Sequence, residues 1–157
     1  MLKHARGNLI DMAEAGDFNL IVHGCNCFHT MGSGIAREIR LRYPGAYEVD
    51  VKQTQWGDRN KIGTFTMLPG PLFSIVNAYT QIGFNGAGQT EDLFEYAGFQ
   101  RILDTLAQQF PGTRVGFPYI GTGLAGGNRE RITAMLEAFA VRHAESMGTV
   151  TLVEFGQ

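Results

Sequence analysis

The stretch Phe18–Ala36, FNLIVHGCNCFHTMGSGIA, joins a compact apolar run to a glycine-rich segment that opens a helical pattern. The run Phe18–Val22 is short and continuously apolar, which is typical of a buried strand. Gly32 and Gly34 stand directly at the start of a helix that the sequence predicts over Gly34–Tyr43. Because a strand, a glycine loop and a helix follow one another, we expect the loop to lie beyond the carboxyl end of a sheet strand, where α/β proteins bind ligands.

The rest of the chain alternates short apolar runs with longer helical patterns. Further strands are predicted at Leu2–Arg6, Thr64–Leu68, Phe73–Ala78, Arg114–Phe117 and Thr149–Phe155. Further helices are predicted over Gly45–Gln55, from Thr90 with two acidic residues in its first turn, and from Asn128 to Gly148. This alternation predicts an α/β fold with a largely parallel central sheet.

The bulk composition is that of a single globular domain over residues 1–157. Apolar residues make up 44% of the chain and charged residues 18%, and the formal net charge is −2. The sequence shows no obvious basic face for binding the nucleic-acid backbone, although a nucleic acid held at one modified end stays open as a substrate. No run approaches the roughly 18 apolar residues of a membrane helix, and the N-terminal segment lacks the apolar core of a signal peptide. We therefore expect a cytoplasmic protein with no membrane partner.

His23, Cys25, Cys27 and His29 occupy alternate positions, which raises the question of a metal site. On an extended strand, alternate Cα atoms lie roughly 6.6 Å apart, so that four of them span about 20 Å. Zinc needs its ligand atoms within about 2.0–2.3 Å of one point, and the chain has no second cysteine pair. A Cys-x-Cys spacing also differs from that of thioredoxin-type redox pairs. We therefore predict two free thiols, no metal ion and no cofactor.

A second glycine-rich segment, Pro118–Gly127, again joins a predicted strand to a predicted helix. Glycine lets the backbone approach a phosphate closely, and the first N–H groups of a helix attract anions. Each loop alone could be no more than a tight turn. Two such loops at one edge of a sheet suit a diphosphate that main-chain donors hold from two sides. The chain has no Gly-Lys-Ser/Thr loop and no strand-linked GxGxxG motif, which argues against an ordinary ATPase or a Rossmann dehydrogenase.

Together these segments resemble a macrodomain, the family of ADP-ribose-binding α/β/α proteins, over nearly the whole chain. The motifs that carry the resemblance are Arg6–Ile10 (RGNLI), Ile21–Asn26 (IVHGCN), Gly32–Ala36 (GSGIA), Pro118 and Ile120–Leu124 (IGTGL). Within the family, the chain is most similar to the branch of ADP-ribose-1''-phosphate phosphatases, on the runs His23–Cys27, Gly32–Ala36 and Arg42–Pro44. The resemblance implies a three-layer α/β/α fold with a mixed, largely parallel central sheet.

The resemblance also implies where ADP-ribose would bind. Asn8 and Leu9 would face the adenine, Phe155 would stack on it, and Asn26 would bond the distal ribose. The diphosphate would be wrapped by Gly32, Ser33, Gly34, Ile35 and Ala36 and by Ile120, Gly121, Thr122, Gly123 and Leu124. Ser33 is equally consistent with a turn residue that faces solvent.

The chain departs from the family pattern at several positions. Many macrodomains have an aspartate where Asn8 stands, and an asparagine where His23 stands. A related branch removes ADP-ribose from macromolecules with a lysine and an aspartate, but Ser74–Tyr79 contains no lysine and Ala125–Gly127 no aspartate. These differences count against that particular mechanism, although other groups could release ADP-ribose.

His23 is the predicted catalytic residue, because it ends a strand near the expected distal ribose and an imidazole titrates near neutral pH. The alternative is a core histidine whose two ring nitrogens are both satisfied by backbone groups, and His29 is the second choice of catalyst. We expect hydrolysis of ADP-ribose-1''-phosphate to ADP-ribose and phosphate. Two alternatives stay open: a non-catalytic reader of ADP-ribose, and a hydrolase that removes ADP-ribose from protein or nucleic acid. The expected partners are therefore ADP-ribose, its 1''-substituted derivatives and ADP-ribosylated macromolecules.

Overall fold

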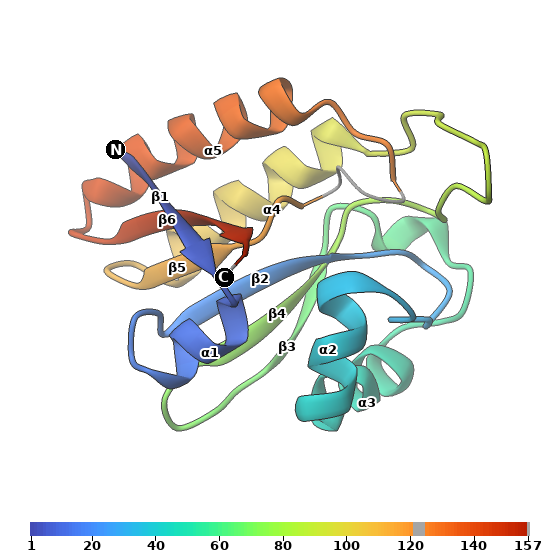
Figure 1. Cartoon of the computed structure of the whole chain (residues 1–157), viewed down its shortest axis with the longest axis horizontal. Helices are drawn as coiled ribbons and strands as arrows, with labels where there is room; N and C mark the ends of the chain where they lie inside the picture. Colours follow the sequence, from blue (N-terminus) through green and yellow to red (C-terminus); the bar gives the residue numbers. More distant parts are fainter. Residues whose placement is uncertain (121–124, 157) are drawn as a thin grey trace.

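A six-stranded sheet forms the centre of the computed structural model, which describes residues 1–120 and 125–156 (Figure 1). Its strands are β1 (Leu2–Gly7), β2 (Leu20–Cys25), β3 (Phe65–Leu68), β4 (Ser74–Tyr79), β5 (Arg114–Phe117) and β6 (Thr149–Phe155). They lie in the order β1-β6-β5-β2-β4-β3, and every neighbouring pair is parallel except the antiparallel pair of β3 and β4. The prediction of a mixed, largely parallel sheet is thereby confirmed.

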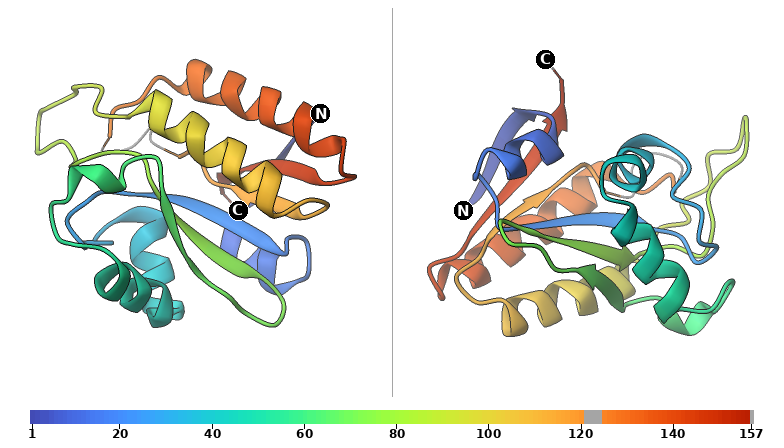
Figure 2. Two further views of the ribbon diagram at one scale, coloured as in Figure 1. Left: turned by 180° about the vertical axis from the view of Figure 1, so that it is seen from behind. Right: turned by 90° about the horizontal axis from the view of Figure 1, so that it is seen from below.

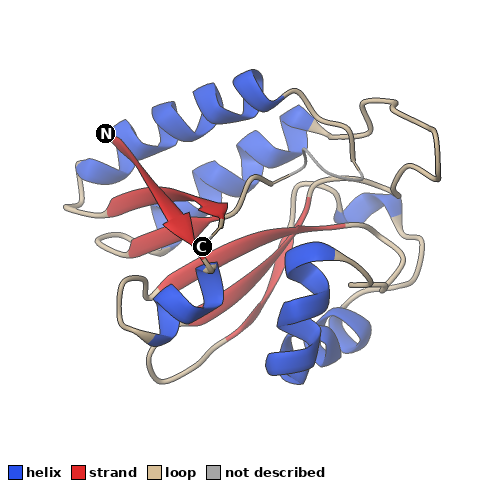
Figure 3. Ribbon diagram, in the orientation of Figure 1, coloured by secondary structure: helices blue, strands red, loops and turns tan. Residues whose placement is uncertain are grey.

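Helices cover both faces of the sheet, and the three layers are visible in Figure 2 and Figure 3. The helices are α1 (Leu9–Glu14), α2 (Gly34–Arg42), α3 (Pro44–Gln53), α4 (Tyr96–Gln109) and α5 (Arg129–Ala144), with a short 3-10 turn, η1 (Arg59–Lys61). One face of the sheet carries α1, α2 and α3, and the other carries α4 and α5. Among the helices of the described residues, none is long and apolar enough to cross a bilayer.

Each layer of helices packs on the sheet through its own hydrophobic core. On the side of α4 and α5, the rings of Phe99, Phe117 and Phe139 meet edge to face, with centroids 6.4 and 5.9 Å apart. The core on the other side gathers buried residues from α1, α2 and α3. β2 contributes to both cores, because Val22 joins the first and Ile21 the second. Alternate side chains of a strand point to opposite faces of a sheet, so β2 is buried on both.

Asparagine residues begin two of the helices. The Asn128 side chain accepts a hydrogen bond from the backbone N–H three residues later, and this confirms the predicted cap of α5. Asn8 makes the same bond at the start of α1, a helix of six residues that is too short to show a sequence period. The last turn of α5 ends at Ala144, earlier than the predicted end at Gly148.

The prediction that a helix starts at Thr90 is wrong, because α4 starts at Tyr96. The segment before α4 pairs with another loop instead, since the Leu93 N–H donates to the carbonyl of Ala125 at 2.7 Å. Asp92, which was expected in a first helical turn, accepts a hydrogen bond from the Tyr96 hydroxyl. Tertiary pairing thus overrides a local signal for the start of a helix.

The carboxyl ends of β2 and β5 lie side by side in the middle of the sheet, since the two strands pair in parallel. Residues 26–33 lead from β2 into α2, and residues 118–120 follow β5. The two loops that the sequence singles out therefore start at the same edge of the sheet.

Candidate functional site

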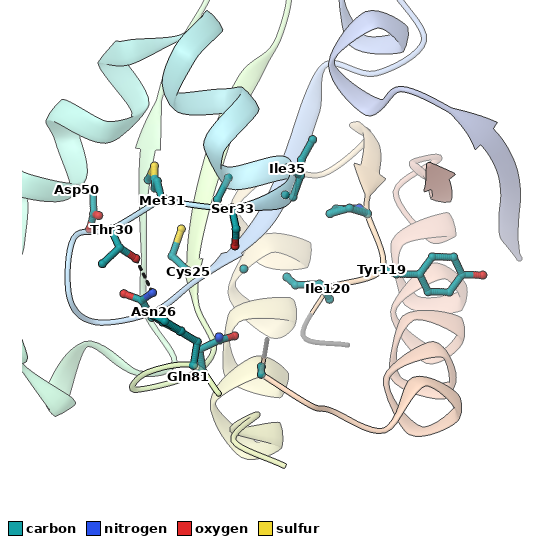
Figure 4. Close-up of a pocket in the computed structure, with 17 residues that line it drawn as sticks. Cys25, Asn26, Thr30, Met31, Ser33, Ile35, Asp50, Gln81, Tyr119 and Ile120 are labelled. Carbon is teal, nitrogen blue, oxygen red and sulfur yellow. Dashed lines mark hydrogen bonds between the residues drawn. The ribbon is translucent and has the colours of Figure 1, made fainter. Parts of the chain in front are cut away.

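A cleft lies over the carboxyl ends of β2 and β5 and consists of two cavities. The loop cavity, of about 570 Å³, lies between the loop after β2 and residues 118–120, and Figure 4 shows the residues that line it. The edge cavity, of about 530 Å³, lies where α1, α2 and the end of β6 approach one another. Gly34, Ile35, Pro118 and Tyr119 line both cavities, so that the two form one continuous cleft.

The loop after β2 is held in shape by its own side chains. The Asn26 amide donates to Thr30 Oγ1 at 2.7 Å (Figure 4). The Asn26 side-chain oxygen accepts from the Phe28 N–H at 2.8 Å. Arg40 of α2 donates to the carbonyl of Thr30 at 2.8 Å. Asn26 thus lines the loop cavity, and its amide is engaged within the loop itself.

The N-terminus of α2 opens onto the cleft. Gly32, Ser33, Gly34, Ile35 and Ala36 all line the loop cavity. Ser33 is the N-cap residue of α2, but its side chain makes no capping hydrogen bond. No described residue accepts a hydrogen bond from the N–H groups of Gly34, Ile35 or Ala36. Because such unpaired N–H groups carry the positive end of the helix dipole, this end of α2 is suited to bind an anion.

The second loop begins with Pro118, Tyr119 and Ile120, which line the loop cavity from the side of β5. Ile120 packs against β2, and a Cβ added to Gly24 would lie 2.8 Å from the Ile120 side chain. Glycine at this position therefore lets the second loop approach β2 closely. The other predicted ligand residues of this loop, which are Gly121, Thr122, Gly123 and Leu124, lie outside the described residues.

The edge cavity presents apolar surfaces to one end of the cleft. Leu9, Ile35 and Val153 line it, together with Phe155 at the end of β6. Phe155 is 79% exposed although it is a large aromatic side chain. An exposed ring beside an apolar slot is suited to stack on a flat ligand ring.

Arg129 stacks on a tyrosine ring at the rim of the edge cavity. The Arg129 guanidinium lies 3.6 Å from the centre of the Tyr119 ring and pairs with Glu154 at 3.4 Å. All three residues line the edge cavity. This rim carries both charges close together, so it adds little net charge to the cavity.

Asn8 lines neither cavity, although the resemblance placed it beside adenine. Its Oδ1 accepts from the Asp11 N–H at 2.9 Å, and its Nδ2 donates to Glu38 of α2 at 2.9 Å. Glu38 does line the edge cavity. Sequence reasoning missed Glu38, because the contact joins two helices whose packing the chain does not reveal.

His23 does not occupy the position that a catalytic residue in this cleft requires. The side chain is completely buried and lines neither cavity. Its Nε2 lies 2.7 Å from Oδ1 of Asn77, the residue opposite it on β4. Burial lowers the pKa of His23 to about 4, so the imidazole is neutral at physiological pH. His23 is therefore a core histidine, as in the alternative, but its Nε2 is held by the Asn77 side chain and not by the backbone. His29, the second choice, lines neither cavity and lies 2.8 Å from Thr54 Oγ1.

Asp50 of α3 is an acid at the site that the sequence analysis missed. It is 1% exposed, yet it lines the loop cavity, at the end away from Tyr119 in Figure 4. The Tyr79 hydroxyl donates to Asp50 Oδ1 at 2.6 Å, and Lys61 Nζ and His29 Nε2 each lie 4.0 Å from that oxygen. Burial and the hydrogen bond to Asp50 raise the pKa of Tyr79, so the hydroxyl stays a donor. A carboxylate fixed in this way can orient water or stabilise positive charge.

Both cysteines are free, buried thiols. Cys25 lines the loop cavity, but burial raises its pKa well above the usual value, which makes the thiol a poor nucleophile. Burial also raises the pKa of Cys27. Among residues 1–120 and 125–156, no three His, Cys, Asp or Glu side chains gather closely enough to hold a metal ion.

Two curated proteins are similar to this chain in sequence, while no protein-family model matches it. The "Uncharacterized 17.5 kDa protein in tk-vs intergenic region" of Enterobacteria phage T4 is 30% identical over 148 residues, which cover 89% of this chain and 90% of that protein. The ADP-ribose 1''-phosphate phosphatase of Aspergillus oryzae is 38% identical over 48 residues, or 31% of this chain and 22% of that enzyme. The first relative establishes a family, and the second likeness is local.

Several solved structures have the same fold, and the similarity covers most or all of this chain. The macrodomain of Mycobacterium tuberculosis DarG is similar with a TM-score of 0.70 and 20% identity, over 100% of this chain and 98% of that one. Thermosipho africanus DarTG in complex with ADP-ribose is similar with a TM-score of 0.61 and 13% identity, over 89% of this chain and 38% of that one. The chain is therefore a macrodomain by its fold, and it belongs to the same protein family as the 17.5 kDa protein of phage T4.

Proposed function

We propose that the cleft binds ADP-ribose, with the adenosine in the edge cavity and the diphosphate and distal ribose in the loop cavity. The observation that carries this proposal is the position of the α2 N-terminus, where Gly34 and Ile35 line both cavities. A ligand that spans the two cavities passes the unpaired N–H groups of α2 at its middle. The middle of ADP-ribose is the diphosphate, whose charge suits the N-terminus of a helix.

The two cavities differ in the way that the two ends of ADP-ribose differ. Leu9, Ile35 and the exposed ring of Phe155 give the edge cavity apolar surfaces for a purine. Asn26 and Gln81 give the loop cavity polar groups for ribose hydroxyls. The DarTG structure with this fold contains ADP-ribose, which supports the choice of ligand.

We further propose that the protein hydrolyses an ADP-ribose derivative that carries a group on its distal ribose. Asp50 lines the end of the loop cavity away from Tyr119, where the distal ribose would lie. Its carboxylate can accept a proton from the attacking water. With ADP-ribose-1''-phosphate, water attacks phosphorus, the bond between phosphorus and the ribose oxygen breaks, and that oxygen takes up a proton. ADP-ribose and phosphate then leave, and the local likeness to the Aspergillus phosphatase supports this substrate.

A second candidate reaction cleaves the ADP-ribosyl bond to a protein or nucleic acid. Asp50 is the one charged side chain among the described residues that line the loop cavity. Cleavage at the anomeric carbon passes through an oxocarbenium-like state, whose positive charge a carboxylate stabilises. A phosphomonoester is an anion, so main-chain N–H groups would have to hold it beside this carboxylate. Asp50 therefore favours a glycosidic bond, whereas the likeness to the phosphatase favours the phosphate.

The proposal can be tested with wild type, Asp50→Asn and the control variant Asp104→Asn. Asp104 lies exposed on α4, pairs with Arg142 and lines neither cavity. Calorimetric titration with ADP-ribose measures binding. Product release is followed from ADP-ribose-1''-phosphate, an ADP-ribosylated peptide and an ADP-ribosylated oligonucleotide. We expect the wild type to turn over one of these substrates. Asp50→Asn should reduce that turnover rate by about 100-fold or more, whereas Asp104→Asn should not change it. Both variants should keep the affinity of the wild type for ADP-ribose.

Each outcome separates one part of the proposal from the others. A wild type that does not bind ADP-ribose would overturn the ligand. Binding without turnover of any of the three substrates would identify a reader. Equal turnover by the wild type and Asp50→Asn would keep the hydrolase and remove Asp50 as its base.

A cytoplasmic location is part of the proposal. Both cysteines are free thiols in this structure, and free thiols persist in a reducing compartment. Fractionation of the cells that express the protein would test this location.

A further inference from the structure

Glu38 places a fixed carboxylate in the edge cavity. It lies on the second turn of α2, lines the cavity together with Leu9 and Phe155, and has a side chain that is 31% exposed. Its Oε1 accepts hydrogen bonds from Asn8 Nδ2 at 2.9 Å and from Arg42 Nη1 at 3.0 Å. Asn8 is the N-cap residue of α1 and Arg42 lies on the next turn of α2, so the two donors fix the carboxylate from two sides.

The second oxygen of the same carboxylate is available. No described residue donates a hydrogen bond to Glu38 Oε2. Arg42 also pairs with Asp11 at 2.8 Å, so that one guanidinium contacts both carboxylates. An ionised carboxylate accepts hydrogen bonds and cannot donate one. Oε2 therefore offers a pure acceptor to any ligand in the edge cavity.

Asn8 cannot serve in place of Glu38. Its oxygen is used by the Asp11 N–H at the start of α1, and its amide nitrogen donates to Glu38. Since Asn8 also lines neither cavity, it positions the carboxylate and does not itself meet a ligand in the edge cavity.

We propose that Glu38 selects the nucleobase by accepting a hydrogen bond from the exocyclic amino group of adenine. This inference rests on the proposed binding of ADP-ribose. The substituent at position 6 of a 6-aminopurine carries N–H donors, whereas a 6-oxopurine such as hypoxanthine has an oxygen acceptor at that position. Two acceptors that face each other lose the hydrogen bond and repel, and hydrogen bonds to charged groups are the strong ones. The protein therefore discriminates against 6-oxopurine diphosphate riboses.

The inference is tested by titrating ADP-ribose and its hypoxanthine analogue, inosine diphosphate ribose, into three proteins. These are the wild type, Glu38→Gln and the control Glu14→Gln. Glu14 belongs to the same cluster around Arg42 but lines neither cavity. The wild type should bind ADP-ribose about 10- to 100-fold more tightly, because the hypoxanthine analogue loses a hydrogen bond to the charged Glu38 in a partly exposed site. Glu38→Gln should bring the two affinities within about threefold, since an amide can donate to the 6-oxo group.

The ratio of the two affinities on one protein does not depend on the fraction that is folded. Glu14→Gln should keep the preference of the wild type. Equal binding of the two ligands by the wild type, or an unchanged preference in Glu38→Gln, would overturn the role of Glu38 and leave ADP-ribose binding intact. A wild type that binds neither ligand would overturn the proposed function and this assignment with it.

Discussion

The side-chain amide of Asn8 donates a 2.9 Å hydrogen bond to the carboxylate of Glu38, while its oxygen caps α1. The bond joins the N-cap of α1 to the second turn of α2 beside the edge cavity. Position 8 therefore has to supply both an acceptor, for the start of α1, and a donor, for Glu38. An asparagine meets both requirements, because its Oδ1 accepts from the Asp11 N–H and its Nδ2 donates to Glu38.

Asn8→Asp should destabilise the protein by about 1–2 kcal/mol, because it sets two carboxylates against each other at hydrogen-bond distance. The double variant Asn8→Asp/Glu38→Gln should recover most of that loss, since the donor and the acceptor are exchanged. Urea unfolding at pH 7 measures both effects. Additive losses in the double variant would show that the two side chains do not interact.

Gly34→Glu should abolish ADP-ribose binding, with a loss of more than about 100-fold, because a carboxylate at the α2 N-terminus would repel the diphosphate. Gly34 has φ +57°, and a Cβ added to it meets no atom within 4 Å, so the side chain would extend into open space at the cleft. Gly16→Glu is the matched control, since Gly16 has φ +95°, equally open surroundings and no place in either cavity. Tight binding by folded Gly34→Glu would remove this loop from the site.

Phe155→Ala should weaken ADP-ribose binding by roughly 5- to 150-fold, since stacking of a base on an aromatic ring contributes about 1–3 kcal/mol. The exposed ring has few contacts to lose, so the stability of the protein should change little. Leu72→Ala, at a residue that is 67% exposed and lines neither cavity, should leave the affinity unchanged. Calorimetric titration of the three proteins checks the prediction, and equal affinities would place the adenine elsewhere.

The free energy of unfolding should depend on pH through His23. Its pKa is lowered from 6.5 to about 4 in the folded protein because the ring is buried, so the unfolded chain binds a proton first as the pH falls. The neutral ring therefore contributes full stability above pH 6.5, and about 3 kcal/mol is lost between pH 6.5 and pH 4. Urea unfolding across this range should show a smaller loss for His23→Gln than for the wild type. Parallel pH profiles would contradict the burial of a neutral imidazole.

Tyr79→Phe should destabilise the protein by about 1.5–3 kcal/mol, because the buried Asp50 carboxylate loses a hydrogen bond. Tyr96→Phe is the control, since Tyr96 also donates to an aspartate, Asp92, but at the surface. Its loss should stay below about 1 kcal/mol, because water replaces the hydroxyl. Equal losses in the two variants, measured by urea unfolding, would show that burial does not strengthen the Tyr79 bond.

Some strands could be predicted from the sequence at their observed bounds. Arg114–Phe117 and Thr149–Phe155 are short apolar runs between turn residues, and both occur as predicted. β2 was predicted over Phe18–Val22 but spans Leu20–Cys25. Its end is set by pairing with β4, in which Cys25 lies opposite Tyr79, and a single sequence does not show this register.

The glycine loop of the site could be predicted as well, because glycine before a helix has a direct backbone meaning. Its buried side chains could not. The contact of His23 with Asn77 joins positions 54 residues apart, and that of Asp50 with Tyr79 joins positions 29 apart. The identity of a histidine or an aspartate does not tell whether it faces a cavity or the core. The sequence therefore pointed to His23, which is buried and lines neither cavity, and gave no signal for Asp50, which lines the loop cavity.

The helices α1 and α5 are closed at their first turn by Asn8 and Asn128, whereas Ser33 leaves the first turn of α2 without such a side chain. An anion in the cleft would cap the first turn of α2, as the two asparagines cap α1 and α5. Binding of the ligand would then also satisfy the N–H groups in the first turn of α2. Part of the binding free energy would appear as slower amide hydrogen exchange in that turn, and as a rise in melting temperature with ligand concentration.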